Sequence, residues 1–224
     1  MFPALMDRGR TIHRYETFEG VPAAREWLAD IYRRDRTEGQ RVSVYLGVEK
    51  AGIVAQLQEW FGDLGVPVLA LGGYGSQTYV DDVVADVQAT GRPAVLLYAG
   101  DHDPSGEDID RDFAARTNCW REVRRVALTA AQVTAHALPP QPGKELDSRA
   151  RGFVERHGRL VQVELDALPP DVLRQLFADA LADHWDDAAY QAALAQEGDD
   201  RLALADATVT SGSAPPTAST GRRR

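Results

Sequence analysis

A short apolar run that ends in closely spaced carboxylates constrains this chain more than any other feature. Ala94–Ala99 is uniformly apolar, and after Gly100 the segment Asp101–Gly106 reads Asp-His-Asp-Pro-Ser-Gly. A continuous apolar run of this length predicts a strand buried on both faces, as in a parallel sheet. In open α/β sheets, ligands gather beyond the carboxyl ends of such strands. The pattern therefore predicts a ligand site at Asp101 and Asp103.

The spacing of the two aspartates suits a shared cation. Side chains two residues apart lean to the same side of an extended chain, so Asp101 and Asp103 can face one ion while His102 points away. Carboxylates are the hard oxygen ligands that Mg²⁺ and Mn²⁺ prefer. A helix cap followed by a turn explains the same residues, because Asp, Pro, Ser and Gly are all common there. On these residues alone, a helix cap and a metal site are alternatives.

Three apolar runs alternate with helical segments in the first part of the chain. Strands are expected over Val42–Val48, Val66–Leu71 and Ala94–Ala99, and the first helix is expected over Ala51–Leu64. This β-α-β-α-β-α order predicts an α/β fold with a parallel sheet flanked by helices. Glu49 directly follows the first strand, so the sheet would deliver Glu49, Asp101 and Asp103 to one edge.

Taken in order, these motifs resemble a known family. The strand-end Glu49, the glycine-rich turn at 72–75 and the Asp101–Gly106 box resemble a Toprim domain, which topoisomerases, bacterial primases and several nucleases share. The Asp-Pro-Ser-Gly form and the segment Val163–Pro169 are most similar to the A subunit of archaeal type IIB topoisomerases and to small stand-alone Toprim proteins. The resemblance covers about residues 41–183 and implies a Rossmann-like α/β fold.

The resemblance also implies roles for the acidic residues. Glu49 would take part in acid-base chemistry or help to hold metal, and Asp101 and Asp103 would bind Mg²⁺ or Mn²⁺. Glu107, one helical turn beyond Asp103, would extend this metal site. A glutamate in the first turn of a helix is also favoured by the helix dipole, which is the alternative for Glu107.

Candidate contacts to DNA phosphate surround these acids. Lys50 can steady a phosphate, or it is a surface lysine at a helix start. Gly73, in the glycine-rich turn, allows close approach of the backbone or makes a tight turn. Lys144 and Arg149 lie in a loop expected over Pro139–Arg151, and they resemble residues of related stand-alone proteins in which such a loop could contact phosphate. A plain connecting loop is the alternative.

The later part of the chain is expected to extend the same domain. We expect a strand over Glu122–Leu128, a short helix capped by Thr129, a strand over Leu160–Leu165 and a helix that begins at Pro170. Glu164 and Asp166 alternate along the expected strand. They reach the metal site if that strand lies beside the one ending at Asp101, and an exposed strand face explains them equally well.

Composition indicates one α/β domain with polar extensions. The chain has 224 residues, of which 44% are hydrophobic, which suits a single core. We expect a helical extension over residues 1–40, the α/β domain with a C-terminal helical extension over 41–197, and a disordered tail over 198–224. The sequence has no apolar run of membrane-spanning length and a single cysteine, Cys119. These features favour a cytoplasmic protein that does not contact a membrane.

The net charge of −9 argues against strong, unassisted DNA binding. Basic residues nevertheless gather in three groups: Arg33, Arg34, Arg36 and Arg41; Arg121, Arg124 and Arg125; and Lys144, Arg149, Arg151, Arg156 and Arg159. Each group can also be a solvated surface. Weak or partner-dependent DNA binding follows from this balance.

The resemblance implies a metal-dependent DNA endonuclease that nicks or cleaves phosphodiester bonds. Type IIB topoisomerases also need a catalytic tyrosine on a preceding helical domain, and the roughly forty residues before the first strand are too few for an independent core. Tyr32 lies in an amphipathic helix expected over Val21–Arg34, where packing accounts for an aromatic residue. The alternative is therefore a non-hydrolytic DNA-binding or topoisomerase-like subunit that needs a partner chain with that tyrosine. A homodimer of this chain is a further alternative for the partner.

Two further classes fit the motifs less well. Phosphatases of the haloacid-dehalogenase class place their Asp-x-Asp pair after the first strand and follow it with Thr or Val, whereas Asp103 follows the third strand and precedes Pro104. The turn at 72–75 does not give the Gly-x-Gly-x-x-Gly spacing of a dinucleotide-binding fold.

Overall fold

The computed structural model describes residues 15–72, 75–142 and 147–206. These residues divide into two compact units. The larger is Asp35–Leu194, and the smaller consists of the described parts of Met1–Arg34 and Ala195–Arg224.

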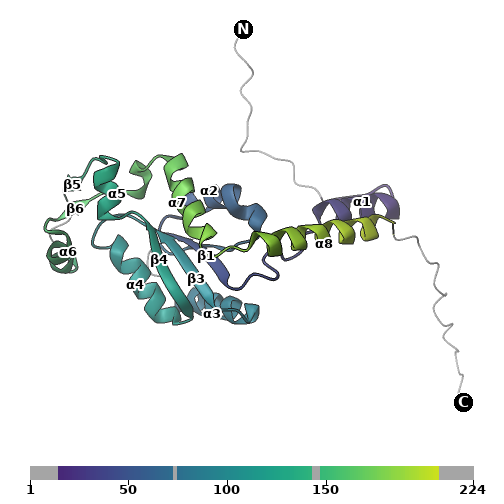
Figure 1. Ribbon diagram of the computed structural model, residues 1–224, viewed down its shortest axis with the longest axis horizontal. Coiled ribbons are helices and arrows are strands. Elements are labelled where there is room, and N and C mark those ends of the chain that lie inside the picture. Colours follow the sequence, from purple (N-terminus) through teal and green to yellow (C-terminus); the bar gives the residue numbers. More distant parts are fainter. Residues whose placement is uncertain (1–14, 73–74, 143–146, 207–224) are drawn as a thin grey trace, which may run out of the picture. The chain divides into compact units, whose positions relative to one another are not determined.

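A four-stranded, all-parallel sheet forms the centre of the larger unit (Figure 1). Its strands are β1 (Ser43–Val48), β2 (Val68–Ala70), β3 (Ala94–Ala99) and β4 (Trp120–Ala127), and their order is β2-β1-β3-β4. Every residue of β1 and β3 is buried, as expected for strands covered on both faces. The predicted Rossmann-like α/β fold, a parallel sheet flanked by helices, is confirmed.

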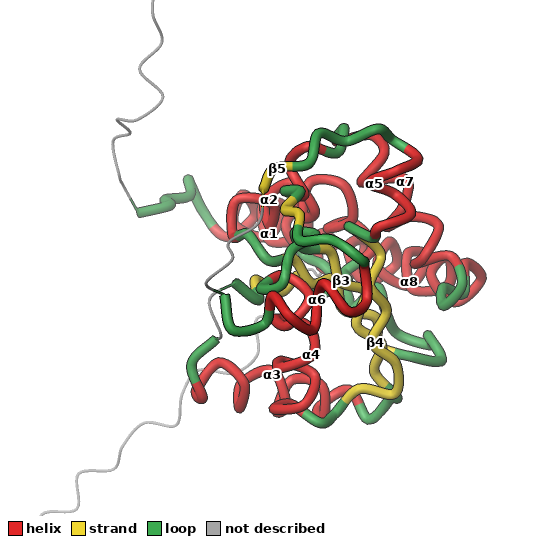
Figure 2. Tube along the Cα trace, turned by 90° about the vertical axis from the view of Figure 1, so that its left-hand side faces the viewer, coloured by secondary structure: helices red, strands yellow, loops and turns green. Residues whose placement is uncertain are grey.

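Helices cover both faces of the sheet. The connections between strands are α2 (Ala51–Phe61) with the short helix η1 (Gly62–Leu64), α3 (Gln77–Thr90) and α4 (Gly106–Thr117). Side chains alternate along the strands, so Leu46 and Leu97 pack with α2 on one face, whereas Leu96 packs with α3 and α4 on the other. Figure 2 shows the strands lying between these two helical layers.

The strand order places a topological switch between β1 and β3. The chain leaves β1 for β2 on one side and then crosses to β3 on the other side of β1. The two strands pair in register from Ser43 with Ala94 to Val48 with Ala99, so their carboxyl ends lie side by side. Such a switch point is where open α/β sheets bind ligands.

The remainder of the larger unit is built from short elements. They are α5 (Ala130–Ala135), β5 (Gln141–Pro142), α6 (Ala150–His157), β6 (Val161–Gln162), η2 (Leu165–Ala167) and α7 (Pro170–Ala182). Thr129 begins α5 with a capping box, and α7 begins at Pro170, both as predicted. α7 covers the same face as α2, through Leu173 and Phe177.

Two predicted elements need correction. The loop expected over Pro139–Arg151 contains β5 and the first residues of α6. The strand expected over Leu160–Leu165 is reduced to β6, because Val163 instead forms an antiparallel bridge with His102 and η2 begins at Leu165. The bridge draws this segment to the end of β3.

The smaller unit joins α1 (Val21–Ile31) to the last residues of α8 (Asp187–Asp206). The Tyr32 hydroxyl donates to Asp200 at 2.9 Å, and the backbone N–H of Arg34 donates to Glu197 at 3.0 Å. α8 continues to Asp206, so residues 198–206 of the predicted tail are helical, and the rest of that tail lies outside the described residues. None of the helices in the described ranges is both long and apolar enough to cross a membrane.

Candidate functional site

Glu49 and Asp101 meet at the switch point. The backbone N–H of Glu49 donates to Ala99 O at 3.1 Å, which continues the β1–β3 ladder past the strand ends. The backbone N–H of Asp101 then donates to Glu49 Oε2 at 2.9 Å. The structure thus brings together the two strand-end acids that the sequence placed at one edge of the sheet.

Asp101 is held on two sides. Its Oδ1 accepts a hydrogen bond from the backbone N–H of Leu165 at 2.8 Å and lies 3.6 Å from Lys50 Nζ. Burial raises the pKa of both Glu49 and Asp101 above the ordinary carboxyl value, and the negative charge of Asp103 adds to the rise at each. A cation at this edge would favour the ionised form of both groups.

Asp103 begins α4. Its Oδ1 accepts hydrogen bonds from Ser105 Oγ at 2.9 Å and from the backbone N–H of Gly106 at 2.6 Å. These contacts are those of the helix-cap alternative, because they satisfy donors at the start of the helix. Asp103 also lies close enough to Glu49 and Asp101 to affect the pKa of each.

Two glycines let the backbone close around these acids. A Cβ added at Gly106 would lie 2.2 Å from Asp101 O and 3.1 Å from Glu49 Oε2. A Cβ added at Gly72 would lie 2.2 Å from Glu49 O. Backbone atoms at 2.2 Å cannot be moved aside as a side chain can, so the compact edge requires glycine at both positions.

Lys50 places a positively charged side chain at this edge of the sheet. Its Nζ lies 3.2 Å from Glu164, 3.3 Å from Asp166 and 3.6 Å from Asp101. The alternating acids Glu164 and Asp166 therefore reach the site, because the His102–Val163 bridge places their segment beside the end of β3. The predicted phosphate contact of Lys50 remains a prediction, and here the ammonium contacts carboxylates.

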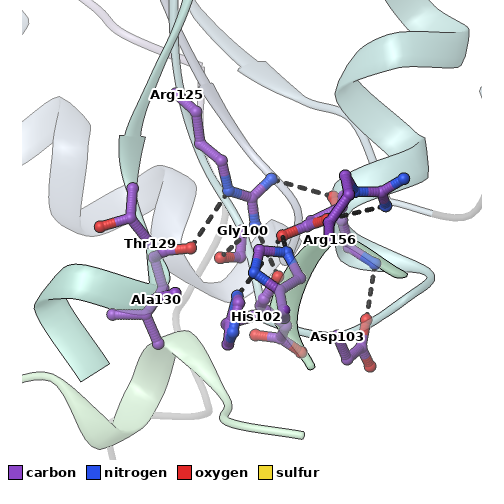
Figure 3. Close-up of polar contacts among 12 residues, drawn as sticks. Gly100, His102, Asp103, Arg125, Thr129, Ala130 and Arg156 are labelled. Carbon is purple, nitrogen blue, oxygen red and sulfur yellow. Dashed lines mark hydrogen bonds and ion pairs between the residues drawn. The ribbon is translucent and has the colours of Figure 1, made fainter. Parts of the chain in front are cut away.

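Arg125 organises the loop that carries the aspartates, a role that no sequence motif indicated (Figure 3). Its guanidinium donates to the carbonyl oxygens of Gly100 at 3.0 Å, Asp101 at 2.6 Å and Gly106 at 3.1 Å, and its Nε donates to Leu128 O at 3.2 Å. Its side chain is only 16% exposed. Arg125 thus connects the carbonyl groups of this turn to one another, and Gly100 O also accepts a hydrogen bond from the backbone N–H of Leu128 at 2.9 Å.

The neighbouring Arg124 belongs to the same basic group in the sequence, Arg121, Arg124 and Arg125, but it has a different environment from Arg125. Arg124 pairs with Glu122 at 3.0 Å and with Asp183 at 2.6 Å, as a surface arginine does. A run of arginines does not reveal which one turns inward. The usable signal is position, since Arg125 lies near the carboxyl end of the strand next to β3.

Glu107 lies in a different group from the aspartates. Its Oε1 is 2.7 Å from His157 Nε2 and 3.5 Å from His102 Nδ1, and its Oε2 accepts from Arg156 at 3.0 Å. Burial alone would raise the pKa of Glu107, but His102, Arg156 and His157 lower it to about 2. Its predicted place in the Mg²⁺ site therefore has no contact in the structure that supports it.

Metal-binding atoms from three side chains come within 4.8 Å of one another at one place in the described part of the chain, His102, Glu107 and His157. Glu49, Asp101 and Asp103 do not form so tight a group, and each already accepts a hydrogen bond from a backbone N–H. A cation shared by these three acids would need water molecules among its ligands, as Mg²⁺ commonly has.

One pocket adjoins Asp103, and a second pocket lies next to the first. The smaller, of about 120 Å³, is bordered by Asp103, Asp147 and Arg149. The larger, of about 510 Å³, shares Pro104 and Arg149 with it and is also lined by Arg111, Arg125 and Arg156. Arg149, a predicted phosphate ligand, makes a two-pronged contact with Asp147 at 2.8 and 2.9 Å. The other two predicted phosphate contacts, Gly73 and Lys144, lie outside the described residues.

A comparison of the sequence with models of known protein families gave no match, and a comparison with curated proteins gave none.

Proposed function

We propose that this protein is a Toprim-like nuclease that cleaves DNA phosphodiester bonds with Mg²⁺ or Mn²⁺. The observation that carries the proposal is the contact between Glu49 Oε2 and the backbone N–H of Asp101, 2.9 Å apart at the switch point of a parallel sheet. Asp103 follows on the same loop. The motif resemblance gives these three acids their roles, and their meeting at one sheet edge supports it.

The donor set fits a hard divalent cation. Magnesium in proteins is held by one or two carboxylates together with water and substrate phosphate. Asp101 and Asp103 would hold the ion, and Glu49 would hold a second ion or accept the proton of the attacking water. When bound, the cation would supply neutralisation of phosphate charge and activation of that water.

The four arginines of the larger pocket, which also contains Glu107, Asp108 and Asp110, support a phosphate-bearing substrate. Arg149 borders both the pocket at Asp103 and the larger pocket, so a phosphate contacting it would lie next to the proposed metal ligand. Arg111 and Arg156 line the same pocket, and each also contacts an acid, Asp108 and Glu107 respectively. Because these arginines are partly neutralised by neighbouring acids, they are consistent with the weak DNA binding expected for a chain of net charge −9.

Plasmid cleavage tests the proposal. Purified protein is incubated with supercoiled plasmid and Mg²⁺ or Mn²⁺, alongside Glu49→Gln, Asp101→Asn and the control Asp82→Asn, an exposed acid on α3. We expect nicked or linear product from the wild type and the control, none from the two site variants, and none after chelation of the metal. Cleavage without divalent ions, or unchanged cleavage by both site variants, would overturn the proposal.

The spacing of the carboxylates favours one second candidate. Because Glu49, Asp101 and Asp103 do not converge on a single point in the isolated chain, a partner could complete the site. In that case the protein is a metal-bearing, non-hydrolytic subunit of a topoisomerase-like assembly. A wild type that binds Mg²⁺ but does not cleave, with binding lost in Asp101→Asn, would favour this candidate over the nuclease.

A further inference from the structure

A buried histidine in the middle of the Asp-His-Asp motif has an unpartnered nitrogen. His102 is 2% exposed, and its Nδ1 makes no hydrogen bond. A buried polar atom without a partner is unfavourable and uncommon in folded proteins. Glu107 Oε1 lies 3.5 Å from this nitrogen, a distance at which the two groups form an ion pair when the imidazole is protonated.

Two further side chains complete a cluster around this nitrogen. Glu107 lies in the first turn of α4, and His157 is the last residue of α6. His157 Nε2 is 2.7 Å from Glu107 Oε1, and the ligand atoms of all three residues lie within 4.8 Å of one another. The rings of His102 and His157 are also in contact, with centroids 4.8 Å apart.

The atoms in this cluster are those that bind zinc. Zn²⁺ takes imidazole nitrogen and carboxylate oxygen at about 2.0–2.2 Å in a tetrahedral arrangement, in which neighbouring ligand atoms are about 3.3 Å apart. The two separations from Glu107 Oε1, 3.5 and 2.7 Å, bracket that value, and all three ligand atoms lie within 4.8 Å of one another, so rotation of the side chains would bring them around an ion. Imidazole suits zinc and similar transition metals, and it does not suit Mg²⁺.

Arg156 supports the cluster from outside. It donates to Glu107 Oε2 at 3.0 Å, which leaves Oε1 directed at the two histidines. Partners of this kind orient metal ligands and raise affinity. The Arg156 side chain is 59% exposed, so solvent screens its charge and a cation in the cluster would not face an unscreened positive group.

We propose that His102, Glu107 and His157 form a binding site for Zn²⁺ or a similar transition-metal ion, with water as a further ligand. The site would tie α6 to the loop after β3 and to the start of α4. It is separate in chemistry from the oxygen-only edge of Glu49, Asp101 and Asp103, and it does not depend on the proposed nuclease activity.

Metal titration of the full chain tests this inference. Zn²⁺ is added to metal-free protein in the presence of millimolar Mg²⁺, which fills oxygen sites without competing for imidazole, and binding is followed by calorimetry. Co²⁺ serves as a second probe, because its visible absorption reports ligand number and geometry. We expect one ion per chain in the wild type.

The variants are His157→Gln and Glu107→Gln, with His136→Gln as the control because His136 is exposed at the end of α5. His157 is at the end of its helix and 20% exposed, so its replacement should leave the fold intact, which circular dichroism checks. Since loss of even an outer partner weakens metal sites about 10- to 100-fold, we expect at least about 100-fold weaker binding in both site variants and no change in the control. No uptake by the wild type, or weakening below about tenfold in folded His157→Gln, would overturn the proposal.

Discussion

The two sides of the loop after β3 use opposite means to gather polar groups. On the carboxylate side, Glu49, Asp101 and Asp103 are each fixed by backbone N–H groups, and their side chains do not converge on one point. On the histidine side, His102 and its two neighbours contact one another through side chains and do converge. Consecutive residues of one loop thus serve two different arrangements.

This difference in how the side chains are held indicates which kind of metal ion each side is suited to bind. Backbone hydrogen bonds hold carboxylates in place without using all of their oxygens, which suits an ion that keeps water and shares substrate phosphate. Direct side-chain contact suits an ion that is enclosed by protein ligands. Arg125 and Gly106 belong to both sides, because they fix the loop backbone itself.

The largest expected effect comes from removing that shared support. Arg125→Met would remove a largely buried guanidinium that donates to four carbonyl groups, and Asp110 would lose its ion pair at 3.6 Å. We expect this substitution to lower the free energy of unfolding by about 3–5 kcal/mol. Arg124→Met, which removes surface ion pairs only, should cost less than about 1 kcal/mol. Urea unfolding followed by circular dichroism measures both. Equal stabilities of the two variants would show that the buried contacts of Arg125 do not support the loop.

Gly106→Ala should come next. The added Cβ would lie 2.2 Å from Asp101 O, so the loop must shift, and we expect a loss of about 3 kcal/mol together with loss of metal binding on both sides. Gly52→Ala in α2 is the matched control, because a Cβ there meets open space. It should stabilise the protein by up to about 1 kcal/mol. If Gly106→Ala and the wild type have the same urea midpoint of unfolding, the close approach of residue 106 to Asp101 O is not required for stability.

Metal addition should separate the two sides. Zn²⁺ at about 100 times its Kd should add about 2.7 kcal/mol of stability. Because the proposed zinc ligands lie at the end of α6 and the start of α4, Zn²⁺ should slow amide hydrogen exchange in α6. Mg²⁺ should leave exchange in α6 unchanged. Protection of α6 by Mg²⁺ as strong as that by Zn²⁺ would remove the distinction between the two sides.

The smallest effect is expected at Lys50. Its ammonium lies among Asp101, Glu164 and Asp166 and competes with a cation for them. Lys50→Met should therefore tighten Mg²⁺ binding by roughly two- to fivefold, which corresponds to an exposed ion pair of about 0.5–1 kcal/mol. Arg151→Met, at an exposed arginine of α6, should not change the affinity. Calorimetry measures both, and weaker binding in Lys50→Met would mean that the lysine assists the cation.

The carboxylate side could be predicted because it depends on strand ends. Glu49 and Asp101 each follow a short apolar run, and parallel strands bring such residues to one edge whatever the details of packing. Whether Glu164 and Asp166 lie near the proposed metal site depended on whether their segment lay beside β3. That placement results from the His102–Val163 bridge, which no local pattern encodes.

The histidine side could not be predicted in the same way. His157 lies on α6, whose eight residues include a glycine and four charged or histidine side chains, so the segment lacks a strong helical signal. Its place in the fold is set by Phe153, which is fully buried, and such short helices depend on tertiary packing. Arg125 was hidden for a related reason, because three of its four carbonyl partners lie in the distant turn at 100–106.

The crossing of the chain from β2 to β3 has a consequence for how the protein acquires its chemistry. Glu49 and Asp101 are 52 residues apart in sequence and meet only after β3 has paired with β1. Pairings between distant segments form late, since the chain between them must first be closed into a loop. A fragment released before β3 is made would contain Glu49 without Asp101. Cation binding at this edge would thus report that β3 has been made and has paired with β1.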